Sequence, residues 1–169
     1  MRARRIHQIA LCVIGALVLT ACGSGSGVDI EYVHFPDRDP SINMPYTPAI
    51  KVHSGKLVFV SGVTAAPVYH SHPHILSEFD GIPADAAAQA EMTMLNLQAT
   101  LEAAGGEITD VIQLNRFIVN IAENQDAINA TAARFLGDHR PASTTVEVTR
   151  LATDPRLVLE IEAIAVVPE

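Results

Sequence analysis

The sequence predicts an α+β domain in which one β-sheet carries two helices on one of its faces. Two segments have apolar residues at helical spacing, and several shorter segments are rich in β-branched and apolar residues. The helical segments lie between the strand segments, in the order β-β-α-β-α-β-β. Because every helix and sheet must bury an apolar face, packing both helices on one face of a single sheet satisfies this pattern.

The clearer helix is expected over residues 84–104, where six apolar residues at spacings of three and four form one stripe: Ala87, Ala90, Met94, Leu97, Leu101 and Ala104. Gly105 and Gly106 are expected to end this helix. A second helical face is formed by Ile128, Ala132, Phe135 and Leu136, and Gly137 follows it directly.

Strands are expected over residues 50–52, 57–60, 111–119, 144–151 and 157–167. The short polar link 53–56 between the first two predicts a hairpin, and the turn at 153–155 predicts a closing hairpin of the last two. Four prolines without clear periodicity predict an irregular lead-in over residues 28–48. Residues 65–83 are expected to form a loop.

The composition is that of one acidic domain. The chain has 169 residues and a formal net charge of −8, and three of its eleven basic residues lie within the first five positions. Without that segment, 8 basic residues face 19 acidic ones. This balance argues against a nucleic-acid partner, since phosphate binding needs clustered Lys and Arg. Both cysteines, Cys12 and Cys22, lie near the N-terminus, which leaves the rest of the chain without a thiol.

The N-terminus has the pattern of a bacterial lipoprotein signal peptide over residues 1–21. Three arginines precede a short apolar run at 9–19, and Leu19-Thr20-Ala21-Cys22 resembles a lipobox. An ordinary signal peptide followed by a chance cysteine is the alternative. The prediction is export, lipidation of Cys22 and anchoring to the cell envelope, at the periplasmic face of the outer membrane if there is one. Residues 22–42 are then the lipidated cysteine, a Gly/Ser tether and the lead-in, and residues 43–169 are the domain.

A series of short motifs within that domain resembles the RidA/YjgF family of reactive-intermediate (imine) deaminases. The matching pieces follow one another in the family's order, from about Asn43 to Val167: Pro45-Tyr46-Thr47-Pro48-Ala49, Ser61-Gly62, Leu101-Glu102-Ala103-Ala104-Gly105, Asn129-Ala130-Thr131, Pro141-Ala142 and Glu160-Ile161-Glu162-Ala163. The resemblance implies a chorismate-mutase-like fold, a homotrimer and ligand sites in clefts between subunits. It also implies hydrolysis of 2-imino acids to 2-keto acids and ammonia, without a cofactor.

The resemblance places a site on five positions: Tyr46, Gly62, Asn129, Ser143 and Glu160. Glu160 matches the family's water-handling glutamate, and Tyr46, Gly62 and Asn129 match its substrate-binding positions. Active members have an arginine after Pro-Ala to grip the substrate carboxylate, and Ser143 stands there in this chain. A serine offers no charge and no bidentate fork. Arg140, three residues earlier, is the candidate substitute.

Each of these residues also has a plainer interpretation. Glu160 could pair with Arg150 on a neighbouring strand, Asn129 could cap its helix, and Tyr46 could be a packed loop aromatic. Gly62 could simply end a strand, and Arg140 could be a solvated loop charge.

His70, His72 and His74 alternate within the predicted loop, so an extended segment would place all three on one side. Neutral imidazoles suit Zn, Cu or Ni, which makes the three histidines weak candidates for a metal site. The alternatives are a polar loop at the edge of the site, or hydrogen bonding to an anionic ligand.

Two classes of function remain open at this point. One is an imine-hydrolysing enzyme that works outside the cytoplasm despite Ser143. The other is a non-catalytic, membrane-tethered trimer that binds a small metabolite or a metal ion.

Overall fold

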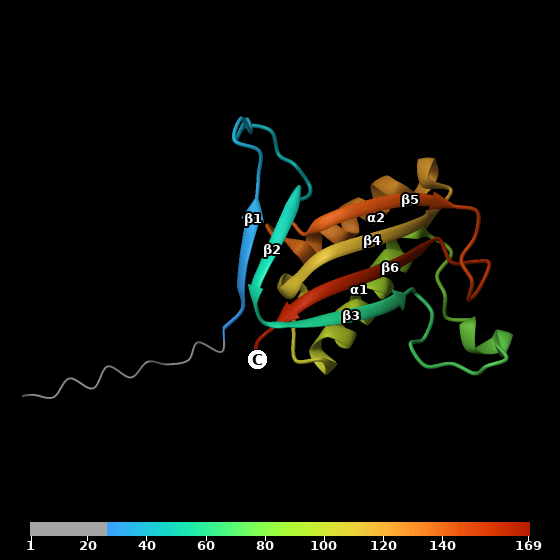
Figure 1. The fold of residues 1–169 in the computed structure, drawn as a ribbon. Helices are drawn as coiled ribbons and strands as arrows, with labels where there is room; N and C mark the ends of the chain where they lie inside the picture. The colour runs from blue at the N-terminus through green and yellow to red at the C-terminus, as the bar shows by residue number, and fades with distance from the viewer. Residues whose placement is uncertain (1–26) are drawn as a thin grey trace, which may run out of the picture.

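The computed structural model describes residues 27–169 and shows two helices packed on one face of a four-stranded sheet (Figure 1). A separate two-stranded sheet stands at one end of this layer pair. The predicted signal peptide, Cys22 and most of the Gly/Ser tether lie outside the described residues. Within residues 27–169, no helix is both long enough and apolar enough to cross a bilayer.

The main sheet has the strand order β3-β6-β4-β5, formed by Lys56–Val63, Leu159–Val167, Val111–Val119 and Ala142–Val148. β6 is antiparallel to both of its neighbours, whereas β4 and β5 are parallel. The parallel pair needs a crossover connection, and the helix between β4 and β5 provides it. The α+β fold with two helices on one face is therefore confirmed.

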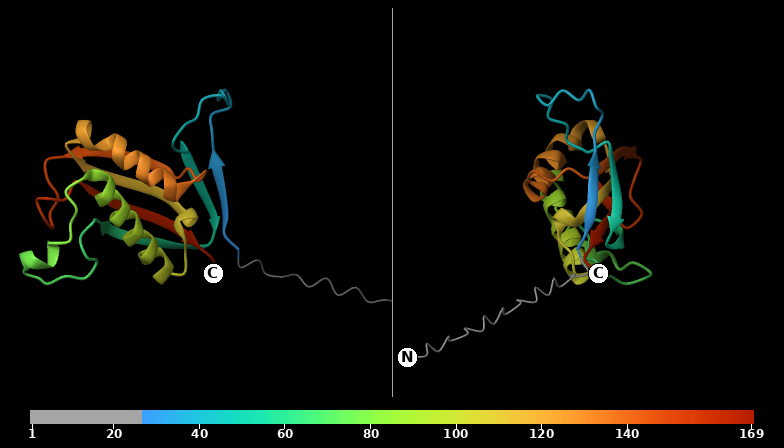
Figure 2. Two further views of the ribbon diagram at one scale, coloured as in Figure 1. Left: turned by 180° about the vertical axis from the view of Figure 1, so that it is seen from behind. Right: turned by 60° about the vertical axis from the view of Figure 1, so that its left-hand side comes forward.

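Helices α1 (Ala86–Ala103) and α2 (Ile121–Leu136) lie side by side behind the sheet (Figure 2). Asp85 caps α1 by accepting a hydrogen bond from the Ala88 N–H at 2.8 Å. The middle of the predicted stripe is fully buried, but its outer members Ala87 and Ala104 are exposed. Short 3₁₀ turns at Leu76–Phe79 (η1) and Ile108–Asp110 (η2) precede α1 and β4.

The alternation of side chains along β6 sorts the sheet into two faces. Leu159, Ile161, Ala163 and Ala165 are buried in the core beneath the helices. Glu160 and Glu162 alternate with them and therefore face the opposite, open side of the sheet. This division decides where each candidate site residue lies.

The predicted N-terminal hairpin is wrong. β2 (Ala49–Ser54) pairs with β1 (Asp29–Val33) in the small sheet, and β3 pairs with β6 in the main one. Gly55 makes a corner between the two sheets with a φ of +114°, where a Cβ would lie 2.5 Å from Val166 Cγ1. The lead-in is therefore not irregular throughout, because β1 lies within it.

The predicted closing hairpin is also wrong, because β4 separates β5 from β6. Consequently β6 residue Glu160 lies opposite Phe117 of β4, and the suggested cross-strand pair of Glu160 with Arg150 is not formed. Helix α2 carries the chain from β4 to β5, and a loop carries it back from β5 to the centre of the sheet.

We expect Leu97→Ala to destabilise the fold by about 2–5 kcal/mol, because Leu97 is 0% exposed at the centre of the core and its truncation leaves a cavity. Leu95→Ala on the same helix is the control, since Leu95 is 50% exposed. Urea unfolding at one protein concentration measures both variants. Equal losses of stability would contradict the assigned core.

Candidate functional site

A cavity of about 360 Å³ lies between α2 and strands β4 and β5, and we call it the Ser143 cavity. Three of the predicted site residues line it, namely Asn129, Arg140 and Ser143. The register brings Ser143 of β5 opposite Leu114 of β4, whose side chain belongs to the core beneath the helices. The cavity therefore opens on the helix-covered side of the sheet.

Arg116 of β4 also lines the Ser143 cavity, although it lies outside the motifs of the family resemblance. Its Nη1 donates a hydrogen bond to Asn129 Oδ1 at 2.8 Å. Its Nε is buried and has no hydrogen-bond partner among residues 27–169. Burial lowers the pKa of this guanidinium, although an arginine of this kind still keeps its proton at neutral pH. The cavity thus contains a half-buried cation with no carboxylate paired to it within the described residues.

Asn129 lies in the middle of α2 and holds Arg116, so it does not cap the helix. Arg140 is oriented differently, because its Nη1 donates to the backbone carbonyls of Gly137 at 2.6 Å and His139 at 3.0 Å. Those bonds turn the Arg140 guanidinium toward its own loop. Of the two arginines at the Ser143 cavity, Arg116 is the better placed to receive an anion.

A second cavity, of about 320 Å³, contains Gly62 and Glu160, and we call it the Glu160 cavity. A β-bulge between Val60 and Val63 shifts the register of β3 against β6 at this point. A Cβ at Gly62 would overlap the Glu160 carboxylate, so a larger residue there would push that carboxylate away from the β3 backbone. The close approach of the Glu160 carboxylate accounts for a glycine at position 62 better than the end of a strand does, because β3 continues to Val63.

Glu160 is half-buried, and two effects raise the pKa of its carboxyl group. Burial disfavours the charged form, and the like charge of Glu162 adds to the shift. A carboxyl group with a raised pKa is suited to accepting a proton from water and returning it near neutral pH.

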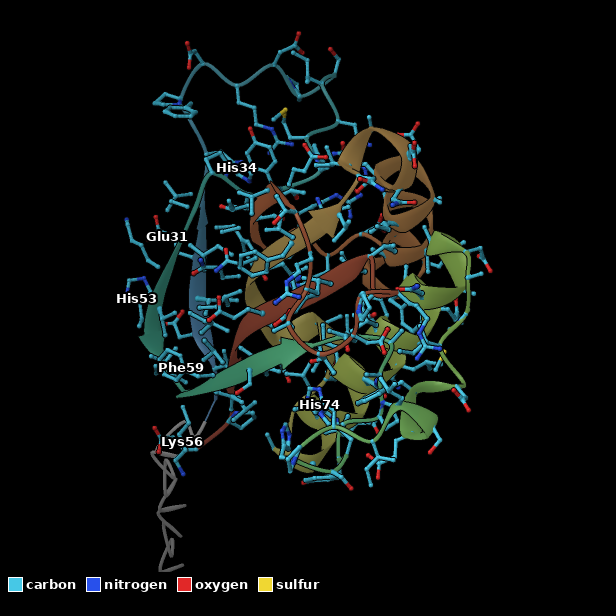
Figure 3. All side chains as sticks on the ribbon, turned by 90° about the vertical axis from the view of Figure 1, so that its right-hand side faces the viewer. Glu31, His34, His53, Lys56, Phe59 and His74 are labelled. Carbon is cyan, nitrogen blue, oxygen red and sulfur yellow. The ribbon has the colours of Figure 1, made fainter. Side chains whose placement is uncertain are left out.

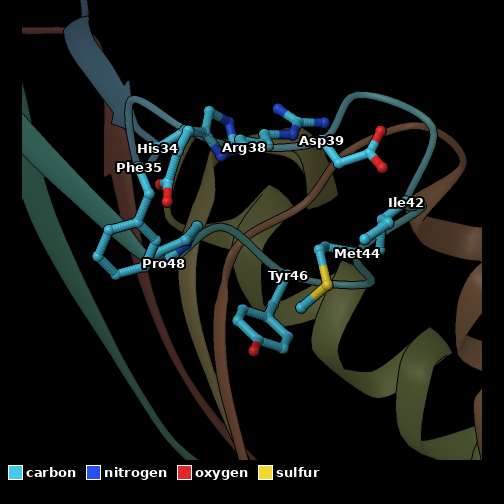
Figure 4. Close-up of a pocket in the computed structure, with 9 residues that line it drawn as sticks. His34, Phe35, Arg38, Asp39, Ile42, Met44, Tyr46 and Pro48 are labelled. Carbon is cyan, nitrogen blue, oxygen red and sulfur yellow. The ribbon is translucent and has the colours of Figure 1, made fainter.

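Tyr46 lies in neither cavity of this single chain. It is 39% exposed and lines a hollow of about 380 Å³ together with Arg140 and His139. It also borders the larger hollow, of about 630 Å³, under the loop between β1 and β2, where its ring points away from Arg38 and Asp39 (Figure 4). The Thr47 N–H donates to the Pro141 carbonyl at 3.2 Å and so fixes Tyr46 near the start of β5.

One chain therefore brings the predicted residues together in two groups rather than one. Asn129, Arg140 and Ser143 share one cavity, with Tyr46 close by, whereas Gly62 and Glu160 share the other. Residue Arg116 faces the helices, because it contacts Asn129, while Glu160 faces the open side of the sheet.

The comparisons with known proteins define the class. Residues 37–167 match the family model described as Endoribonuclease L-PSP. The chain therefore belongs to this family, and its relatives include Rid and YjgF proteins.

Two relatives stand out among the similar sequences. The chain is 31% identical over 130 residues to Protein DfrA of Myxococcus xanthus, which is 77% of this chain and 91% of that protein. It is 40% identical over 88 residues to the 2-iminobutanoate/2-iminopropanoate deaminase of Escherichia coli. The second match covers 50% of this chain and 66% of that enzyme.

Solved structures of Rid and YjgF proteins have a similar fold. A Rid-family protein of unknown function from Yersinia pestis has a TM-score of 0.64 and 26% identity, with 82% of this chain and 98% of that chain covered. The YjgF gene product of Escherichia coli has a TM-score of 0.54 and 34% identity, with 66% and 81% covered.

Replacing Glu160 with glutamine is expected to stabilise the protein at neutral pH. A carboxyl group whose pKa is raised by folding contributes stability below its ordinary value of 4.5, and this stability is lost as the pH rises through the folded-state pKa. The stability gap between Glu160→Gln and the wild type should therefore widen from about pH 4 to about pH 7. Glu102→Gln, at an exposed position of α1, is the control in chemical denaturation. If the difference in unfolding free energy between Glu160→Gln and the wild type narrowed with rising pH, the raised pKa of Glu160 would be contradicted.

Proposed function

We propose that this protein hydrolyses 2-imino acids to 2-keto acids and ammonia, with Arg116 gripping the substrate carboxylate in place of the arginine that Ser143 has replaced. The observation that carries the proposal is the position of Arg116 in the same cavity as Ser143 and Asn129. The named activity of the Escherichia coli relative supports the reaction class.

Arg116 has the chemistry that the first step of this reaction needs. Its planar guanidinium can donate two parallel hydrogen bonds to a carboxylate, and half-burial strengthens such a charge-assisted contact. The buried Nε, unpartnered among residues 27–169, is a donor ready for that contact. Arg116 lies opposite Thr145 of β5, two residues after Ser143. It therefore lies on the strand next to Ser143 and on the same side of the sheet.

Glu160 carries out the second step. It accepts a proton from a water molecule while the water oxygen forms a bond to the iminium carbon, and the C=N π electrons move to nitrogen. Glu160 then returns this proton to the nitrogen. As the C–N bond breaks and ammonia leaves, Glu160 accepts the proton of the new hydroxyl group, so that the C=O bond of the 2-keto acid forms, and it passes that proton to the ammonia to give ammonium. The raised pKa of Glu160 suits these transfers.

The reaction requires Arg116 and Glu160 from different copies of the chain, because they face opposite sides of one sheet. We propose a homotrimer whose intersubunit clefts bring the two cavities together. Large apolar side chains on the main sheet support such an assembly, since Leu57, Phe59 and Val146 are 51%, 73% and 41% exposed. Phe59 is labelled on β3 in Figure 3.

Nucleic acid is a poor substrate for this surface, although the family model is named for an endoribonuclease. The formal net charge of −8 repels phosphates, and the basic residues are not clustered in the sequence beyond the N-terminal segment. A carboxylate of small-molecule size fits the Arg116 guanidinium of the Ser143 cavity better.

Replacing Arg116 with alanine should lower kcat/KM for freshly generated 2-iminopropanoate by about two orders of magnitude, because a charge-assisted bidentate contact is lost. Arg116→Lys keeps the charge but not the fork and should recover only part of the loss. The double variant Arg116→Ala/Ser143→Arg should recover more. Arg150→Ala, at an exposed position after β5, is the matched control.

Ammonia release measured by a coupled assay tests these variants, and circular dichroism checks their folding. A wild type that does not exceed the buffer rate would exclude the enzyme. If the inactive wild type nevertheless showed a ligand-dependent rise in Tm, the non-catalytic binding trimer would be supported.

We also propose that the chain is exported and anchored through lipidated Cys22 to the cell envelope. The basic start, the short apolar run and the small residues before Cys22 support this proposal. Several acyl chains on one cysteine would hold the protein stably on a membrane, whereas a single chain would not.

Labelling with radioactive palmitate in a bacterial host should mark the full-length chain and leave Cys22→Ala unlabelled. Cys12→Ala is the control, because that cysteine lies within the apolar run. Equal labelling of both variants, or none in the wild type, would exclude lipidation at Cys22.

A further inference from the structure

We propose that His70, His72 and His74 bind one divalent transition-metal ion, with Zn²⁺, Cu²⁺ and Ni²⁺ as the class of ligand that fits. The three side chains offer one ligand nitrogen each, and these atoms all lie within 4.8 Å of one another. They form the one group of three or more His, Cys, Asp or Glu side chains with such spacing among the described residues 27–169. This proposal stands independently of the deaminase activity.

The three imidazole rings lie close together, and two of them pack against one buried side chain. The ring centroids lie 4.8 Å apart for His70 and His72, 5.0 Å for His70 and His74, and 4.8 Å for His72 and His74. His70 and His74 both pack edge-on against Phe79, at 5.2 and 5.4 Å. Phe79 is 1% exposed, so this platform is rigid and holds two of the three rings in place.

The tautomer of His70 is set by its backbone contact. Its Nδ1 lies 2.8 Å from the Pro67 carbonyl oxygen, which can only accept a hydrogen bond. The Nδ1 atom must therefore carry the proton, which leaves the Nε2 lone pair free to bind a metal ion. Metal-binding histidines in proteins are usually oriented by such a bond from the second ring nitrogen.

Glu78 of η1 holds the histidine loop in place through Ser71, which lies between His70 and His72. Its Oε2 accepts the Ser71 backbone N–H and its Oε1 accepts the Ser71 hydroxyl, both at 2.7 Å. The carboxylate also lies close enough to His70 and His74 to interact with them electrostatically. Glu78 therefore acts as a positioning residue that adds negative charge beside the site, which favours a bound cation.

Three imidazoles leave at least one position of a tetrahedral ion open for water or another ligand. Nitrogen ligands around Zn²⁺ lie roughly 3.3 Å apart, given bond lengths of about 2.0–2.1 Å. The rings must therefore move together slightly, and His72 and His74 can do so because both are exposed. His70 also lines the Glu160 cavity, so the ion would lie at the edge of that cavity.

The site is remote from the other described histidines on the small sheet. Figure 3 shows His74 on the loop after β3, whereas His53 and His34 lie on and beside the β1–β2 sheet. In Figure 1 that loop and the small sheet occupy opposite ends of the molecule. His53 is about half-exposed and lies 3.5 Å from Glu31, which makes it a matched control for the loss of a surface imidazole.

The test is a calorimetric titration of the full chain, purified without a polyhistidine tag and stripped with a chelator, using ZnCl₂. One ion should bind per chain, and Co²⁺ should give the visible absorption of a three-histidine site. His74→Ala should weaken Zn²⁺ binding by about 100-fold and His53→Ala should leave it within about twofold. Glu78→Gln should weaken it by about tenfold.

Circular dichroism shows whether each variant is folded, and His72→Ala provides a second exposed position where His74→Ala loses structure. The proposal is overturned if the wild type binds no Zn²⁺ in the titration. It is equally overturned if His72→Ala and His74→Ala bind as tightly as His53→Ala, because the ion would then be held elsewhere.

Discussion

The half-buried guanidinium of Arg116 is the constraint around which the Ser143 cavity is organised. A cation placed between a sheet and a helix loses hydration, and it is stable there only if polar groups replace the lost water. Asn129 supplies one hydrogen bond, while the Nε has no partner among residues 27–169. An anionic ligand would complete this environment. Under the proposed function, this unfavourable burial of a charge is what provides the preference for a carboxylate.

Much of the fold could be predicted from the sequence, because the helical stripe and the β-rich segments follow from burial alone. The hydrophobic spacing of α1 and α2 and the glycines after them are local signals that predict both helices, although the predicted face at 128–136 covers only the second half of α2. Strand pairing is not a local property. Gly55 can make a hairpin turn or a corner, and the pairing of β2 with β1 and of β3 with β6 decides between them. For the same reason the sequence did not reveal that β6 inserts between β3 and β4.

The candidate site was predicted in part. Gly62 and Glu160 lie together as expected, and so do Asn129 and Ser143, yet one chain holds them in two cavities. Arg116 was missed because it lies outside the motifs of the resemblance. The available signal was that Arg116 is the one charged residue of β4, a strand that also contains the polar residues Gln113 and Asn115. Because Arg116 faces the helix side of the sheet and Glu160 the open side, the proposed reaction needs two copies of the chain.

The most direct measurement is a crystal structure of the full chain with a bound 2-keto acid, the product of the proposed reaction. We expect a trimer in which both oxygens of the ligand carboxylate contact Arg116 of one subunit. Glu160 of the neighbouring subunit should lie within hydrogen-bonding distance of the ligand carbonyl, directly or through one water. A monomer, or a ligand whose carboxylate is bound away from Arg116, would contradict the account.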